Sequence, residues 1–169
     1  MRILLISLPR TGSNSLMKQK MNELNLTAIG ELFNPRSNTN GLYDWETMDN
    51  IILKTIVNQV PVGVDDIHEF WIKISTTFDE VILLSRRNLI ECGQSLAFFD
   101  YYKGSGFKYD SKYTWKPTPN FQQAYDFVKE LDDMIVKLSN ELNIPITYYE
   151  DIFDSQSKQK LRNNSNHLI

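Results

Sequence analysis

The residues with the clearest chemical potential lie close to the start of the chain, between an apolar run and a polar segment typical of a helix. The apolar run Ile3–Ile6 is followed by the turn Pro9–Ser15. Gly12 permits a tight bend there, a helix start adds about half a positive charge, and Arg10 adds a full one. The side-chain donors around the helix start are Thr11, Ser13, Asn14 and Ser15. The turn therefore predicts a phosphate or sulfate site, and the alternative is an ordinary helix start capped by a serine.

The turn lacks the residues of a nucleoside-triphosphate loop. A Walker A loop follows the pattern GxxxxGK[ST], whose second glycine and lysine are absent here. A divergent P-loop nucleotide kinase is therefore the weaker alternative. The carboxylate pairs at positions 65–66 and 132–133 have no further ligands at matching spacing, so no metal site is expected.

A second group of anion-binding residues follows another apolar run, Val81–Leu84. Arg86 and Arg87 come at its carboxyl end, and a helix is expected from Asn88. Ser95 lies about two helical turns beyond Arg87, so a guanidinium and a hydroxyl are placed to grip a second phosphate group. Two anion sites at the ends of two strands predict a ligand that is phosphorylated at both ends.

Three segments match the patterns of one enzyme family, in that family's order. Residues 9–16, PRTGSNSL, fit Pro-[Lys/Arg]-[Ser/Thr]-Gly-[Ser/Thr]-x-x-[Leu/Trp]. Residues 87–95, RNLIECGQS, are similar to Arg-[Asn/Asp]-Pro-x-Asp-x-x-x-Ser, and residues 148–152, YYEDI, resemble Tyr-Glu-Asp-[Leu/Met]. The chain thus resembles the sulfotransferases that use 3'-phosphoadenosine 5'-phosphosulfate (PAPS), in particular small bacterial or viral-like members. The resemblance covers Ile3 to about Phe153.

The resemblance implies a role for each of these residues. Arg10 would contact the phosphosulfate and stabilise charge on the leaving oxygen, and Thr11–Ser15 would cradle the 5'-phosphate. Arg87 and Ser95 would hold the 3'-phosphate, and Tyr149 would lie near the adenine. PAPS is then the donor and 3'-phosphoadenosine 5'-phosphate (PAP) the product, with no metal required.

Two residues are candidates for the base that takes a proton from the acceptor hydroxyl. Glu31, in AIGELFNP, follows a predicted break at Gly30 and resembles the proposed base that some bacterial sulfotransferases carry in a Gly-Glu or Leu-Glu segment. His68, in VDDIHEFW, follows a candidate strand, as does the histidine of the Lys-x-His pattern in cytosolic sulfotransferases. Asp66 stands in the place of that lysine. Glu31 is preferred, and His68 is kept as the alternative.

The elements that must position these residues follow from the apolar pattern. The runs Ile3–Ile6 and Val81–Leu84 predict strands buried on both faces of a parallel sheet, and weaker strands are expected at Pro61–Val64 and Ile144–Tyr148. The expected helices cover residues 13–24, 44–59, 69–78, 88–102 and 120–142, and the expected loops cover 34–41 and 103–120. This alternation predicts an α/β protein of three layers, a P-loop-like fold with a central parallel sheet and helices on both faces.

Composition indicates one globular domain over residues 1–169, with ordinary hydrophobic (41%) and charged (23%) fractions. Eighteen basic and 21 acidic residues give a net charge of −3, which argues against a nucleic-acid partner. The single Cys92 indicates a reducing compartment. No apolar run is long enough for a signal peptide or a membrane span, so a cytoplasmic location is expected.

The sequence as a whole predicts a sulfotransferase. It would move a sulfuryl group from PAPS to the hydroxyl of a small-molecule or carbohydrate acceptor by in-line transfer. The chain ends soon after Asp151, where larger members of the family continue, and this favours a non-catalytic nucleotide-binding domain as the alternative. The sequence indicates neither the identity of the acceptor nor the oligomeric state.

Overall fold

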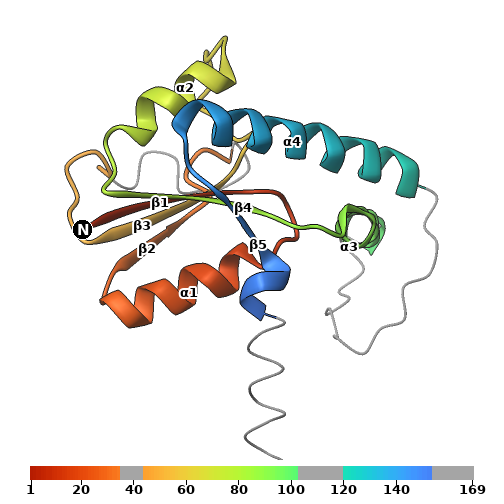
Figure 1. Cartoon of the computed structure of the whole chain (residues 1–169), viewed down its shortest axis with the longest axis horizontal. Coiled ribbons are helices and arrows are strands. Elements are labelled where there is room, and N and C mark those ends of the chain that lie inside the picture. Colours follow the sequence, from red (N-terminus) through yellow and green to blue (C-terminus); the bar gives the residue numbers. More distant parts are fainter. Residues whose placement is uncertain (35–43, 103–119, 154–169) are drawn as a thin grey trace, which may run out of the picture.

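The computed structural model describes residues 1–34, 44–102 and 120–153 (Figure 1). Within these residues, five strands form one sheet in the order β2-β3-β1-β4-β5, and all neighbouring strands are parallel. The strands are β1 Arg2–Ser7, β2 Thr27–Gly30, β3 Ile51–Ile56, β4 Glu80–Ser85 and β5 Ile146–Tyr148. The helices are α1 Ser13–Leu24, α2 Ile67–Ser75, α3 Leu89–Tyr102 and α4 Phe121–Leu142. The expected α/β class with a central parallel sheet is confirmed.

Strand β1 is the central strand of the sheet and the middle of the core. Its residues Ile3–Ile6 have no exposed surface, because β3 and β4 pair with its two edges and helices cover both faces. The register sets Leu4 opposite Leu53 of β3 and Val81 of β4. A strand enclosed on every side is encoded as a continuous apolar run, and this explains why the sequence predicts it correctly.

Helices α2 and α4 cover one face of the sheet and α1 covers the other (Figure 1). Leu4 belongs to the larger core cluster, together with Val128 of α4. Leu5, the next residue, belongs to the smaller cluster with Leu16 of α1. Successive residues of a strand point to opposite faces, so β1 contributes to both cores.

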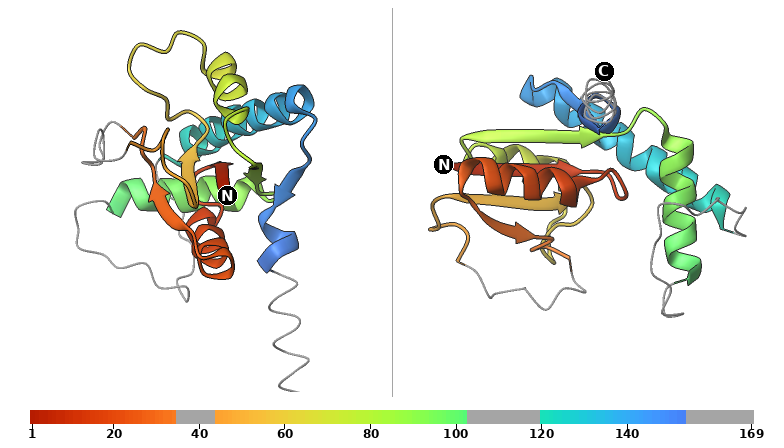
Figure 2. Two further views of the ribbon diagram at one scale, coloured as in Figure 1. Left: turned by 90° about the vertical axis from the view of Figure 1, so that its left-hand side faces the viewer. Right: turned by 90° about the horizontal axis from the view of Figure 1, so that it is seen from below.

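Helix α3 lies beyond the carboxyl end of β4, against the first half of α4 (Figure 2). Gly93 permits this close approach, since a Cβ atom there would lie 2.9 Å from the Cα of Tyr125. Helix α4 turns one apolar stripe toward the sheet, and its buried residues are Ala124, Val128, Leu131, Ile135 and Leu138. The predicted helices at 13–24, 88–102 and 120–142 are confirmed, with ends that differ by at most one residue.

Two predicted elements are wrong. Residues 44–59 were expected to be helical, but they contain β3, which is buried between β2 and β1. Pro61–Val64 is a turn instead of a strand, and Gly63 adopts a left-handed φ of +91° there. Strand β2 is an additional element, and it lacks an apolar run because only Ile29 of its four residues is buried.

The two expected loops and the polar tail lie largely outside the described residues, at 35–43, 103–119 and 154–169. Across the part of the chain that the structure describes, no helix combines the length and the apolar character needed to cross a membrane.

Candidate functional site

The carboxyl ends of four neighbouring strands bring the charged residues of interest to one edge of the sheet. Glu31 directly follows β2, and Lys54 lies beside it on β3, in register with Gly30. The turn that carries Arg10 follows β1, and Arg86 follows β4. In open parallel sheets this edge is where ligands bind, because the following helices begin there.

The turn after β1 has a backbone that bends sharply into α1. Arg10 and Gly12 both adopt left-handed conformations, with φ of 62° and 70°. Thr11 is buried, and its hydroxyl donates to the carbonyl of Leu8 at 2.9 Å, which holds the bend. Gly12 is the N-cap of α1, and no side chain among the described residues caps the helix. The predicted alternative of a serine cap is therefore not what these residues form. The N–H of Ser15 donates to the carbonyl of Gly12 at 2.9 Å, and no side chain in the described part of the chain caps the N–H groups of Ser13 and Asn14 before it.

Helix α3 holds this turn in place through two hydrogen bonds. The Nε of Arg10 donates to the hydroxyl of Ser95 at 3.0 Å. The thiol of Cys92 donates to the carbonyl of Pro9 at 2.9 Å. Burial raises the pKa of Cys92 to about 12, so the residue remains a protonated donor. Residues of the two predicted anion sites, Arg10 and Ser95, are thus in direct contact.

Tyr149 covers the same turn from the other side. A Cβ atom on Gly12 would lie 2.7 Å from the Tyr149 ring, so only glycine fits beneath it. The Tyr149 ring also packs on Phe153, with 4.7 Å between centroids, and the Arg86 guanidinium lies 4.8 Å from its centroid. The third predicted motif therefore meets the first, and Tyr149 forms part of the wall of the turn.

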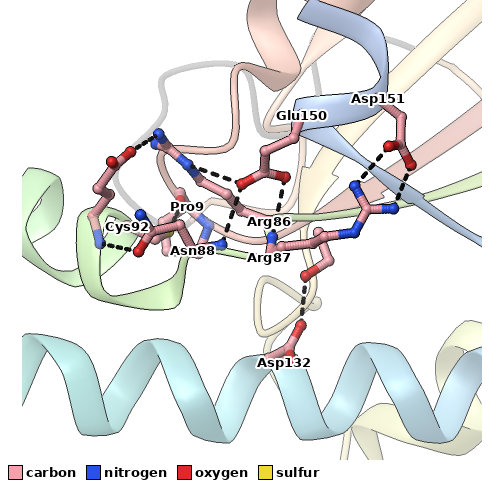
Figure 3. Close-up of polar contacts among 10 residues, drawn as sticks. Pro9, Arg86, Arg87, Asn88, Cys92, Asp132, Glu150 and Asp151 are labelled. Atoms are coloured by element: carbon pink, nitrogen blue, oxygen red, sulfur yellow. Dashed lines mark hydrogen bonds and ion pairs between the residues drawn. The ribbon is translucent and has the colours of Figure 1, made fainter. Parts of the chain in front are cut away.

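Arg86 and Arg87 are engaged by carboxylates of the segment that follows β5 (Figure 3). Arg87 forms a two-pronged ion pair with Asp151, at 2.6 and 2.7 Å. Arg86 pairs with Glu91 and lies 3.7 Å from Glu150. The structure does not bring Arg87 and Ser95 together as predicted: the guanidinium of Arg87 contacts Asp151 and the ring of Tyr148, and Ser95 binds Arg10.

Glu150 closes the turn between β4 and α3. Its carboxylate accepts hydrogen bonds from the backbone N–H groups of Arg87 and Asn88, at 3.1 and 3.2 Å. Burial raises the pKa of Glu150, but these N–H groups and Arg86 outweigh it and leave the pKa below its ordinary value. The hydrogen bond from Arg87 likewise lowers the pKa of Asp151. Both residues are therefore anions at neutral pH.

Glu31 forms a tight ion pair with Lys54 at the edge of the sheet. The Nζ of Lys54 lies 2.5 Å from one carboxylate oxygen, and the side-chain amide of Asn34 donates to the other at 2.9 Å. Lys54 is 3% exposed and Glu31 is 32% exposed. Burial raises the pKa of Glu31, but the hydrogen bonds from Lys54 and Asn34 outweigh it, and the pKa lies below its ordinary value. Glu31 also adopts a left-handed φ of 50°, a conformation that costs energy for glutamate.

His68 lies away from this group of residues. It is in the first turn of α2, and its Nδ1 lies 3.2 Å from a carboxylate oxygen of Glu141, near the C-terminal end of α4. Helix α3 meets α4 near Tyr125, and at about 1.5 Å per residue the helix axis between Tyr125 and Glu141 spans roughly 24 Å. Asp66 is the N-cap of α2 and accepts from the backbone of His68. The structure therefore does not bring His68 to Arg10.

Lys54 is the site residue that the sequence analysis missed. It lies within residues 44–59, for which the sequence predicts a helix, and in the strand that forms there a buried lysine needs an anionic partner. Such a lysine, read as part of a strand, would have indicated a carboxylate at a neighbouring strand end.

Two further features bear on the chemistry of the edge. The hydroxyl of Ser85, the last residue of β4, donates to Asp132 of α4 at 2.5 Å. In the parts of the chain that the structure describes, no three histidine, cysteine or acidic side chains come together as metal ligands would.

The comparisons add no family to this geometry. No protein-family model matches the chain, and no curated protein matches it.

Proposed function

We propose that this chain is a PAPS-dependent sulfotransferase that transfers a sulfuryl group to the hydroxyl of a small-molecule or carbohydrate acceptor. The observation that carries the proposal is the hydrogen bond between Arg10 and Ser95. It joins residues of two sequence motifs that are far apart in the chain, at the edge of the sheet where an anion loop and a carboxylate also lie. The strand order also favours a P-loop-like fold, and so does the position of the loop at the carboxyl end of β1, where ligands bind in such sheets.

In this proposal the turn after β1 binds the phosphosulfate. The first-turn amides of α1 and the side chains of Ser13, Asn14 and Ser15 hold the 5'-phosphate, and the helix dipole favours its charge. Arg10 stabilises the negative charge that grows on the oxygen from which the sulfur departs. Tyr149, packed on Gly12, borders the place where the nucleoside would lie.

Glu31 is the base in this proposal. Its lowered pKa keeps the carboxylate ionised at neutral pH, and it accepts the proton of the acceptor hydroxyl as the oxygen of that hydroxyl bonds to sulfur. Lys54 holds Glu31 in place and adds positive charge beside the transferred group. The contact of His68 with Glu141, near the far end of α4, supports the choice of Glu31 over His68.

Nucleotide binding is the first test. Thermal unfolding should be followed with PAP, with adenosine 5'-monophosphate (AMP) and with ATP plus magnesium, because a ligand raises the melting temperature of the state that it binds. We expect the largest rise with PAP and a loss of the difference between PAP and AMP in Arg87→Ala, whereas Lys18→Ala, an exposed residue of α1, should retain it. A larger rise with ATP and magnesium would favour a kinase instead.

Transfer of radiolabelled sulfate from PAPS to a panel of phenols, alcohols and sugars is the second test. Glu31→Gln should lower the turnover number by about a hundredfold or more, since a positioned base contributes that much. Glu23→Gln, an exposed glutamate of α1, is the matched control and should leave turnover unchanged. Full turnover in Glu31→Gln would remove Glu31 from the mechanism.

A non-catalytic nucleotide-binding domain is the second candidate function. It is favoured by the carboxylates of Glu150 and Asp151, which neutralise the arginines that were expected to bind a phosphate. Tight binding of PAP, together with no transfer to any hydroxyl of the panel, would support this candidate over the enzyme.

A further inference from the structure

The guanidinium of Arg87 is held in an orientation suited to binding an anion. It lies over the ring of Tyr148, 4.4 Å from its centroid, and both of its terminal nitrogens donate to Asp151. Stacking on an aromatic ring and a two-pronged hydrogen bond are the two ways in which proteins fix an arginine for recognition of a phosphate or carboxylate. Asp151 thus occupies the position that an anionic group of a ligand would take.

The two carboxylates of this segment differ in how firmly they are held. The side chain of Glu150 is 22% exposed, and it accepts from two backbone N–H groups that have no other partner among the described residues. The side chains of Arg87 and Asp151 are 52% and 58% exposed. Water reaches both side chains of the Arg87–Asp151 pair and screens their attraction, whereas the Glu150 carboxylate is largely shielded and caps a turn. Asp151 is therefore the carboxylate that a ligand can replace.

We propose that Asp151 is a specificity-determining residue, which competes with a phosphate group of the ligand for the guanidinium of Arg87. The inference rests on the proposed function, because it assumes that the ligand carries a second phosphate. When that phosphate arrives, Asp151 leaves Arg87, and Arg87 stays stacked on Tyr148 with its nitrogens free for the phosphate oxygens. A ligand without the second phosphate leaves the Arg87–Asp151 pair closed.

This competition has a defined effect on affinity. The apparent affinity for a ligand is reduced by the fraction of molecules in which its site is closed. Asp151 therefore weakens the binding of PAP and leaves that of AMP unchanged. For an exposed pair, we expect removal of Asp151 to raise the affinity for PAP about two- to fivefold.

The experiment measures the affinities of PAP, AMP and inorganic phosphate by calorimetry for the full chain and its variants. Asp151→Asn should bind PAP and inorganic phosphate more tightly by that factor and should bind AMP as before. Asp151→Glu, which restores the carboxylate, should return both affinities toward those of the unchanged protein. Asp65→Asn is the matched control, since it removes one exposed carboxylate in the segment before α2.

A double-variant cycle separates competition from a structural role. The gain from Asp151→Asn should disappear when Arg87 is already alanine, because the two residues then have nothing to compete for. An equal gain in the Arg87→Ala background, an equal gain in Asp65→Asn, or no gain for inorganic phosphate would each overturn the inference. If PAP binds no better than inorganic phosphate, the proposed function fails, and the phosphate cycle still decides whether Asp151 competes.

Discussion

At the scale of single residues, the stability of the carboxyl edge of the sheet depends on the ion pair between Glu31 and Lys54. Burial of a cation in a lysine that is 3% exposed is offset by an anion beside it, and Glu31 supplies that anion at 2.5 Å. The glutamate is more exposed than the lysine, so removing one partner of the pair has a different effect from removing the other. Loss of the glutamate leaves a buried cation, and loss of the lysine leaves a carboxylate that water still reaches.

This inequality predicts different stabilities for the two single variants. Glu31→Gln should lower the free energy of unfolding by roughly 3 kcal/mol, because it strands a buried charge. Lys54→Met should lower the free energy of unfolding by roughly 1 kcal/mol, because it removes one hydrogen bond to a carboxylate that water can still reach. Urea denaturation measures both values. The half-buried pair Lys20–Glu80, in which both side chains are reached by water, is changed to Met and to Gln as the matched control and should show small and similar losses. Equal losses at Glu31 and Lys54 would contradict this account.

The raised pKa of Asp132 predicts that stability falls as pH rises, whereas a carboxylate in a typical ion pair makes stability rise with pH. Burial and the neighbouring Asp133 raise its pKa, and the hydrogen bond from Ser85 only partly offsets them. The folded state binds the proton of Asp132 more tightly than the unfolded state does. Ionisation of Asp132 therefore lowers the free energy of unfolding, and this loss is complete above the folded-state pKa. The loss vanishes below about pH 4, where the carboxyl is protonated in both states. Asp132→Asn should therefore raise the free energy of unfolding at pH 7 and have no such effect at pH 3.

Chemical denaturation at both pH values tests this expectation. Asp133→Asn, an exposed neighbour on the same helix, is the control and should have a much smaller effect. A loss of stability at pH 7 in Asp132→Asn would show that the ionised carboxylate is a favourable partner of Ser85.

At the scale of elements, the turn after β1 depends on two segments that follow it much later in the chain. Helix α3 contacts the turn through Cys92 and Ser95, and the segment after β5 contacts it through Tyr149. A turn between a strand and a helix could be predicted at residues 9–16, because local residue types encode it, and Tyr149 was singled out through the family resemblance alone. The partners of Arg87 could not, since an ion pair with Asp151 depends on how β5 pairs with β4.

The elements that prediction missed have a common physical cause. Strand β3 contains Lys54 and Thr55, and polar residues inside a buried strand break the apolar run by which such strands are recognised. The segment Pro61–Val64 has the valines of a strand, yet the left-handed Gly63 makes it a turn. In both cases long-range contacts or backbone conformation override the local preference.

Substitution of Gly12 tests the contact between the loop and Tyr149. Gly12→Ala should lower the free energy of unfolding by about 2 to 4 kcal/mol, because it combines a left-handed φ with a clash against the ring. Gly63→Ala shares the left-handed φ but meets nothing within 4 Å, so it should cost only about 1 kcal/mol. Thermal or urea unfolding gives both values. Similar losses in the two variants would mean that the ring moves aside without cost.

At the scale of the whole molecule, the two ends of α4 belong to different surroundings. Its first half contacts α3 beside the candidate site, and its last turns contact α2, where His68 meets Glu141 (Figures 1 and 2). A side chain at the end of α4 that contacts α2 lies too far from the carboxyl edge of the sheet to touch a ligand bound there. The histidine is therefore expected to act in packing between the two helices.

His68→Gln should accordingly leave the affinity for PAP and the rate of sulfate transfer unchanged, with at most a modest loss of stability. Arg10→Ala, at the other end of the molecule, should lower turnover more than nucleotide affinity, because Arg10 acts mainly on charge that develops during transfer. Steady-state kinetics and calorimetry on the two variants measure these effects. A large fall in turnover for His68→Gln would restore the histidine as the base.

The position of β1 at the centre of the sheet also governs how the chain must fold. Strand β1 gains neither of its neighbours until β3 and then β4, which follow it in the chain, have been synthesised. During that interval a strand with the apolar run Ile3–Ile6 is open to contact with other nascent chains. Production of the protein is therefore expected to benefit from a chaperone that shelters this strand until its partners have been synthesised.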